Sequence, residues 1–208
     1  MDSLENIIKK NLENNCKQKM LTFDFKFGKK VFCYCIDNKI SVDDFEKILL
    51  FVKKNNNPKD IRYYKYRQFY YDNISLYISE QGNQKCTKKI PHEIQMLNNV
   101  KSSILLSVSK KLTLPSHLFS CKLNYDNIED EEVISINIRK LFKLNLSVIT
   151  KDDNSKIYSV YIQFIYNKTK HLEKIDQISK FIALTIKNID NILNENIDDQ
   201  FKKEILVC

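Results

Sequence analysis

Polar side chains that could bind an ion or a phosphate alternate with apolar ones in residues 21–27, which read LTFDFKF. Successive side chains of a β-strand point to opposite faces, so Thr22, Asp24 and Lys26 share one face and the phenylalanines share the other. Gly28 then interrupts the alternation. A carboxylate beside a cation is typical of a solvent-exposed strand, but it also suits a cavity that binds a charged ligand. The segment itself leaves both interpretations open.

Basic side chains recur in other segments that alternate in the manner of strands. The candidates for anion binding are Lys26, Lys88, Lys89, Arg139 and Lys143. If the strands close into a barrel, half of the side chains of each strand point into the lumen. Lysines that point inward would form a tunnel for a polyanion such as a triphosphate, whereas lysines that point outward would only be solvated. The spacing does not distinguish these two arrangements.

Residues 61–71, IRYYKYRQFYY, combine two of the three arginines of the chain with aromatic side chains. Proteins that bind single-stranded nucleic acids use this mixture as a stacking surface. Charged residues also protect edge strands from aggregation, and we favour that second interpretation of the segment.

Several common kinds of site are excluded by composition. Two glycines cannot build a G-x-G-x-x-G or GK[ST] phosphate loop. The six cysteines and three histidines are scattered without zinc-type spacing. We expect no signal peptide, and no apolar run approaches the roughly 18 residues that a membrane span requires. We therefore expect an intracellular, cytoplasmic protein without membrane contacts and with reduced thiols.

The excess of basic over acidic residues favours an anionic partner, since the formal net charge is +8. The same composition is typical of an AT-rich genome, because lysine is abundant while Ala183 is the single alanine. A virus, a linear plasmid or a parasite would fit this bias. Net charge is therefore weaker evidence for nucleic-acid binding than its size suggests.

The periodicity predicts an α+β fold: a closed or strongly curved antiparallel β-barrel of about eight strands, flanked by helices and followed by a long C-terminal helix. Helices are expected at 2–13, 41–54 and 171–193, with a short one from Pro91. Strands are expected at 21–27, 31–36, 63–71, 73–79, 86–90, 102–114, 120–125, 133–150 (one or two strands) and 157–166, with an acidic loop at 126–132. Residues 1–208 would form a single domain, with the barrel at about 21–166 and C-terminal helices at about 170–205.

The order of these segments resembles the metal-dependent RNA 5′-triphosphatases of the tunnel-barrel type, which act in mRNA capping. LTFDFKFG resembles the first strand of that family, E-x-E-x-R-x-G, and the closing strand Y-E-V-E-x-E-F has a counterpart in IYSVYIQF. Between them, KCTKKI, SSILLSVSKKL and NIRKLFKLNLSV are similar in place to the lysine-rich, R-x-S-x-S-x-E and basic strands. The resemblance spans residues 20–194 and implies a barrel that binds RNA 5′-triphosphates.

The residues that bind metal in that family are replaced. The matching positions are Thr22 and Asp24 on the first strand, and Ser159, Tyr161 and Gln163 on the closing strand. A hard divalent cation requires several carboxylate oxygens, so we expect no metal cofactor. Lys26 stands where the family has arginine, which implies that part of the cationic lining is kept.

The leading hypothesis is a divergent, non-catalytic triphosphatase-like barrel, a pseudoenzyme of mRNA processing. It would bind RNA 5′ ends, another polyphosphate or a protein of a capping or transcription complex. One alternative is an active RNA or nucleoside 5′-triphosphatase that uses Mg²⁺ or Mn²⁺, with Asp24 as a catalytic residue. The additional ligands would be Glu129, Asp130, Glu131 and Glu132.

Two further alternatives remain, a purely structural protein-interaction barrel, as in Mediator head subunits, and an unrelated α+β domain. The lumen distinguishes binding from scaffolding, because inward cations predict anion binding and an apolar, filled lumen predicts a structural role.

Overall fold

The computed structural model describes residues 3–15, 20–32, 35–37, 39–97, 102–115, 127–167 and 171–194, with the backbone alone for 29–32, 35, 36, 127 and 172. The helices are α1 (Leu4–Asn15), α2 (Val42–Asn55) and α4 (Ile175–Leu193), with short 3-10 helices at Pro58–Asp60 and Leu172–Lys174. The strands are β1 (Met20–Phe32), β2 (Cys35–Asp37), β3 (Ile61–Tyr71), β4 (Ile74–Ser79), β5 (Gln84–Leu97), β6 (Ser103–Leu114), β7 (Asn127–Ile138), β8 (Phe142–Thr150) and β9 (Lys156–Asn167).

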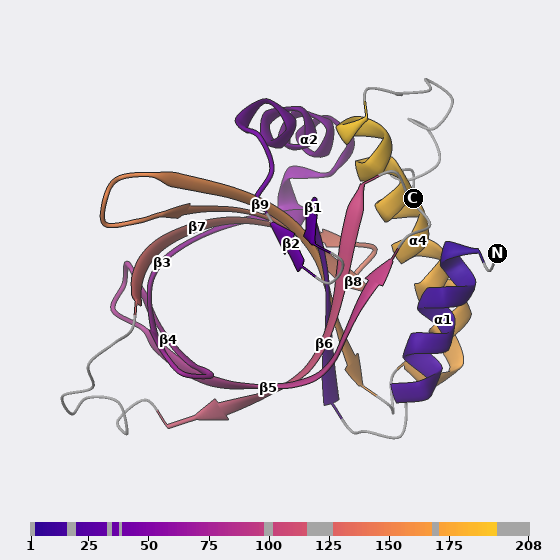
Figure 1. Ribbon diagram of the computed structural model, residues 1–208, viewed down its shortest axis with the longest axis horizontal. Coiled ribbons are helices and arrows are strands. Elements are labelled where there is room, and N and C mark those ends of the chain that lie inside the picture. The colour runs from indigo at the N-terminus through magenta and orange to yellow at the C-terminus, as the bar shows by residue number, and fades with distance from the viewer. Residues whose placement is uncertain are drawn as a thin grey trace.

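Eight of these strands form a closed antiparallel barrel, which appears as a ring in Figure 1. The strand order is β1-β6-β5-β4-β3-β7-β8-β9, and β1 closes the ring because it pairs with β9 as well as with β6. Among the described strands, the short strand β2 pairs with the end of β1. The predicted fold class is thereby confirmed.

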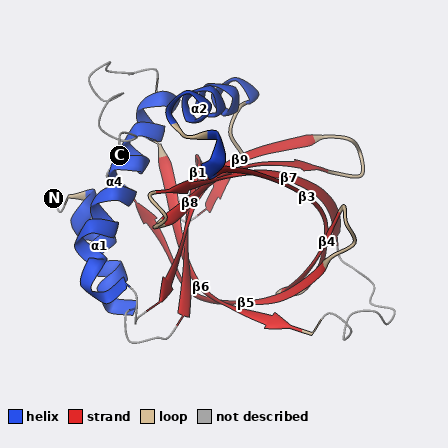
Figure 2. Ribbon diagram, turned by 180° about the vertical axis from the view of Figure 1, so that it is seen from behind, coloured by secondary structure: helices blue, strands red, loops and turns tan. Residues whose placement is uncertain are grey.

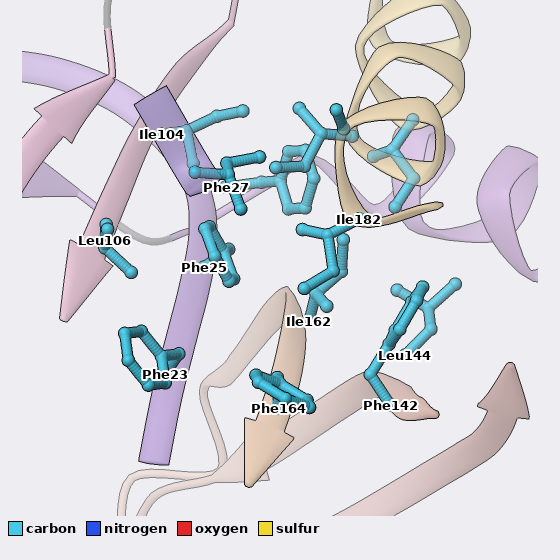
Figure 3. Close-up of a cluster of buried hydrophobic side chains, with 14 of the residues drawn as sticks. Phe23, Phe25, Phe27, Ile104, Leu106, Phe142, Leu144, Ile162, Phe164 and Ile182 are labelled. Carbon is cyan, nitrogen blue, oxygen red and sulfur yellow. The ribbon is translucent and has the colours of Figure 1, made fainter. Parts of the chain in front are cut away.

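The helices lie together against one side of the barrel, as the view from behind shows (Figure 2). The hydrophobic core lies between them and the outer surface of the barrel wall. Phe23, Phe25 and Phe27 of β1 are fully buried there, in a cluster with Phe164 of β9 and Ile182 of α4 (Figure 3). Because the core is outside the ring, the inner face of the wall is free to carry polar side chains.

The predicted helices at 2–13, 41–54 and 171–193 are confirmed with small shifts of their ends. The Ser41 hydroxyl caps α2, since it accepts a hydrogen bond of 3.1 Å from the backbone N–H of Asp44. A 3-10 turn precedes α4, so the regular helix begins only at Ile175. None of the described helices combines the length and apolar character that a membrane crossing requires.

The acidic loop predicted at 126–132 is wrong, because these residues from Asn127 onward belong to β7. Basic side chains of β3 make the acidic strand possible. The Arg67 guanidinium donates to Asp130 at 2.8 Å, and the Lys65 ammonium lies 3.2 Å from Glu132. Opposite charges on directly paired positions stabilise neighbouring strands, which offsets the low strand propensity of aspartate and glutamate.

The helix predicted from Pro91 is also wrong, because β5 continues to Leu97. The register with β6 shifts between Pro91 and Glu93, which marks a bulge. Proline lacks an N–H and is tolerated in a sheet where a bulge interrupts the ladder.

Gly28 likewise does not end its strand. It pairs with Ser103, and β1 continues to Phe32, so the predicted strand at 31–36 is divided between β1 and β2. The candidate strand at 120–125 and any helix after residue 194 lie outside the described residues. The domain boundaries stay a prediction.

Candidate anion-binding lumen

The barrel encloses two adjoining cavities of about 510 and 470 Å³. One reaches the end of the barrel at Asp37 and Lys39, and the other reaches the opposite end at Tyr64 and Asn83. They meet in the centre of the lumen, where both are lined by Tyr77, Thr87, Lys111, Glu131, Tyr161 and Gln163. The lumen is therefore a hollow, polar tunnel rather than a filled core.

The polar face of β1 points into this tunnel. Asp24 and Lys26 line the larger cavity, and Thr22 is buried on the same face of the strand. The register fixes this arrangement, because Asp24 is paired with Gln163 of β9 on one side and with Ser107 of β6 on the other. The interpretation of residues 21–27 as a strand that borders a cavity is confirmed.

Both carboxylate oxygens of Asp24 have partners within the protein. Gln163 Nε2 donates a hydrogen bond of 2.9 Å to Oδ1, and Lys89 Nζ lies 3.7 Å from Oδ2. Asp24 is only 4% exposed. A buried carboxylate that is already paired in this way holds a lysine in the lumen and is poorly placed to accept a further ligand.

Lysines enter the lumen from four different strands and from the segment after β2. The strands contribute Lys26 of β1, Lys85 and Lys89 of β5, Lys111 of β6 and Lys143 of β8. The segment after β2 contributes Lys39. Desolvation within the lumen lowers the pKa of Lys26 and the pKa of Lys111, and repulsion from Lys89 lowers both further. An anion in the lumen would reverse this effect, since it stabilises the charged form of each lysine.

Glu131 is the second buried carboxylate of the lumen. Its oxygen accepts a hydrogen bond from the Ser147 hydroxyl. Burial raises the pKa of Glu131, and this effect outweighs the opposing influence of Ser147 and of the nearby lysines. Burial also raises the pKa of the phenols of Tyr66, Tyr70, Tyr77 and Tyr161, so these side chains are neutral hydrogen-bonding groups.

No protein-family model matches this sequence, and no curated protein sequence matches it. Among solved structures, the S. pombe Pct1 RNA triphosphatase in complex with the Spt5 CTD matches at 12% identity with a TM-score of 0.72, over 95% of both chains. The Mimivirus capping enzyme triphosphatase matches at 11% identity with a TM-score of 0.61, over 88% of this chain and 95% of the other.

This chain has the fold of the RNA triphosphatases. The resemblance inferred from the order of the segments is confirmed at the level of the fold. The low identity means that the chemistry of the lumen has to be read from the residues of this chain.

Within the RNA triphosphatase fold, three of the five predicted anion-binding residues line the lumen, namely Lys26, Lys89 and Lys143. Lys88 is exposed and lies on β5 between two lumen residues, so its side chain points outward. Arg139 is not in a strand as predicted. It lies in the turn after β7, and its guanidinium lies 4.1 Å from the ring centroid of Phe181 in α4. The binding role of these five residues stays a prediction.

The positions that correspond to the replaced glutamates also lie inside the barrel. Ser159, Tyr161 and Gln163 of β9 line the larger cavity. Sequence reasoning missed Lys39, Lys85 and Lys111 and placed Glu131 in a loop. The signal for Lys111 was available, because it lies on the same face of β6 as Ser107, and the other face is apolar except for Lys110.

The donors of this lumen do not fit a divalent cation. In the described part of the chain, no three histidine, cysteine or acidic side chains are close enough to hold a metal ion together. Asp24 is paired with Lys89 and Gln163, and Glu131 accepts from Ser147. Mg²⁺ and Mn²⁺ prefer six oxygen ligands with several negative charges, which this set does not supply.

Replacing Glu131 by glutamine should stabilise the protein more at neutral than at acidic pH. The folded state has the raised pKa, so it binds more protons than the unfolded state just above the ordinary value of 4.5. The contribution of Glu131 to stability therefore falls as the pH rises through that range, and the variant lacks this loss. Urea unfolding of both proteins at acidic and neutral pH measures it, and a difference that does not change with pH would contradict the prediction.

Proposed function

We propose that this chain is a non-catalytic barrel of the RNA triphosphatase fold that binds RNA 5′ ends or another polyphosphate in its lumen. The charge of the lumen carries this proposal. In the described residues that line the two cavities, six lysines oppose three carboxylates, a formal excess of three positive charges. A narrow lumen of one sign with low-dielectric walls attracts ligands of the opposite sign.

The positions of the carboxylates support binding without metal-dependent catalysis. Asp37 lies at the end of the tunnel, 4.0 Å from Lys39. Asp24 is engaged by Lys89, and Glu131 is buried with a raised pKa. Positive charge at a bound phosphate chain would therefore come from lysine ammonium groups, which bind and orient phosphates as point charges.

We also propose that the chain acts inside the cell and binds a partner protein of a capping or transcription complex. Support comes from the S. pombe RNA triphosphatase of this fold, whose structure is in complex with the Spt5 CTD. A barrel that holds an RNA 5′ end without hydrolysing it would retain that end for another enzyme of such a complex.

One observation favours an active metal-dependent RNA or nucleoside 5′-triphosphatase as a second candidate. Asp24 and Glu131 are both in the lumen, and the larger cavity is lined by both. Of the four acidic residues that could assist Asp24, Asp130 and Glu132 are instead paired on the outer face with Arg67 and Lys65. A purely structural barrel has less support, because the lumen is hollow and cationic.

Two measurements on the purified chain test the proposal. Calorimetric titration with inorganic tripolyphosphate should give saturable binding that weakens with salt. RNA with a 5′-triphosphate, incubated with Mn²⁺ or Mg²⁺, should release phosphate no faster than in the absence of the protein. Turnover with Mn²⁺ that Asp24→Asn abolishes would establish the enzyme instead, and the absence of any tripolyphosphate binding would favour the structural barrel.

A further inference from the structure

One end of the tunnel is lined by tyrosines, and we propose that these rings bind the nucleobase of the nucleotide whose phosphates lie in the lumen. This inference rests on the proposed function and adds the chemical class of the ligand to it. The ligand would be a nucleoside 5′-polyphosphate, either free or as the first nucleotide of an RNA. The base would stack at the mouth while the phosphates extend toward the centre.

The smaller cavity contains both aromatic rings and lysines. Tyr64 and Tyr66 of β3 line it toward the mouth, and Tyr77 of β4 lines the central region that it shares with the larger cavity. Tyr66 and Tyr77 are in edge-to-face contact, with ring centroids 5.5 Å apart and an interplanar angle of 87°. Lys111 lies in the region shared with the larger cavity, and Lys143 lines the smaller one beside Tyr161.

The size of the space matches a nucleotide rather than a phosphate chain alone. About 470 Å³ lies within the range of small-molecule pockets, which hold apolar walls and a few placed polar groups. Aromatic rings form the walls here, and Ser79, Asn83 and Gln84 add hydrogen-bonding groups at the same mouth. Amides of this kind can donate to and accept from the edge of a base.

The inward tyrosines are not required for burial of the core. Tyr64 is 38% exposed although it lies in the wall of a cavity. The apolar cluster of the same strands lies on the other face, around Leu76 and Cys86. Tyr64 presents its ring to the open cavity, while Tyr66 and Tyr77 are partly buried beside it. An exposed ring in a binding groove is the arrangement by which proteins stack bases of single strands.

The residues 61–71 thus serve two purposes that their sequence does not separate. Lys65 and Arg67 face outward and pair with acidic residues of β7, as an outer strand surface requires. Tyr64 and Tyr66 alternate with them and face inward. The edge-strand interpretation is wrong, because β3 pairs with β4 on one side and with β7 on the other. The outward charges pair with β7 instead of protecting an edge.

A pair of adjacent tyrosines provides the test. Tyr64→Ala removes a ring from the mouth, whereas Tyr63→Ala removes a ring from the opposite, outward face of the same strand, where Tyr63 is 65% exposed. Titrations would use inorganic tripolyphosphate, ATP and a short RNA with a 5′-triphosphate. Loss of one base stack costs roughly 5- to 150-fold in Kd.

We expect Tyr64→Ala to weaken the binding of ATP or of the RNA by that factor. The binding of tripolyphosphate should weaken by less than about twofold, since only the nucleotides carry a base. Tyr64→Phe should retain the affinity, and Tyr63→Ala should match the wild type. A loss confined to RNA identifies an RNA end, and a loss for both identifies the nucleotide itself. Equal loss for all three ligands, or none, would overturn the inference while tripolyphosphate binding by the wild type still supports the proposed function. No binding of any ligand would remove both.

Discussion

The Lys111→Glu variant should bind tripolyphosphate roughly a hundredfold more weakly than the wild type. Lys111 lines both cavities, so its ammonium group lies where the two halves of the tunnel meet. Hydrogen bonds to charged groups contribute about 1.5–3 kcal/mol, and the introduced carboxylate adds repulsion to the loss. Each 1.4 kcal/mol corresponds to a tenfold change in Kd, which gives the expected factor. Calorimetric titration at physiological salt measures it.

The neighbouring residue supplies a matched control. Lys110 and Lys111 are both exposed, but Lys110 is paired with Ile90 on the outer face, while Lys111 is paired with Lys89 and lines the lumen. Lys110→Glu makes the same change of charge on the outer face, where salt screens it, and should reduce affinity by less than about threefold. Lys111→Gln, which only removes the charge, should fall between the two. Equal losses in both glutamate variants would show that the ligand binds the outer surface of a basic protein instead.

The alternation in residues 21–27 was sufficient to predict the two faces of β1, because period-2 patterning decides which side chains share a face. It was not sufficient to say which face lies inside the barrel. That depends on the helices, which cover the outer wall and bury Phe23, Phe25 and Phe27 there. An antiparallel barrel with its core outside and a polar interior reverses the usual expectation that phenylalanine points inward.

Residues that depend on cross-strand pairing were harder to predict. The acidic segment of β7 forms a strand because Lys65 and Arg67 lie opposite Glu132 and Asp130, more than sixty positions earlier in the chain. Lys88 and Lys89 are equivalent in a list of basic residues, yet only Lys89 reaches Asp24. A shift of one residue in register would exchange them, which is why charge alone could not identify the site.

The Phe25→Ala variant should lower the free energy of unfolding by about 3–5 kcal/mol, the usual cost of removing a buried phenylalanine. Phe25 is fully buried in the cluster between β1, β9 and α4 (Figure 3). Its loss would leave a cavity between the wall and the helix that rigid barrel strands cannot close. This cost is a large part of the 5–15 kcal/mol typical of a folded domain. Urea unfolding followed by circular dichroism measures it.

The next residue, on the opposite face of the same strand, should show the reverse behaviour. Lys26→Met replaces a half-buried ammonium, whose pKa is lowered by desolvation, with an apolar side chain of similar length. Stability should be unchanged or increased, because a buried charge costs solvation, while tripolyphosphate affinity should fall roughly tenfold or more. Phe25→Ala should retain that affinity in its folded fraction. If Lys26→Met instead unfolds the protein as Phe25→Ala does, the inward face of β1 is needed for folding and its cations cannot be assigned to ligand binding.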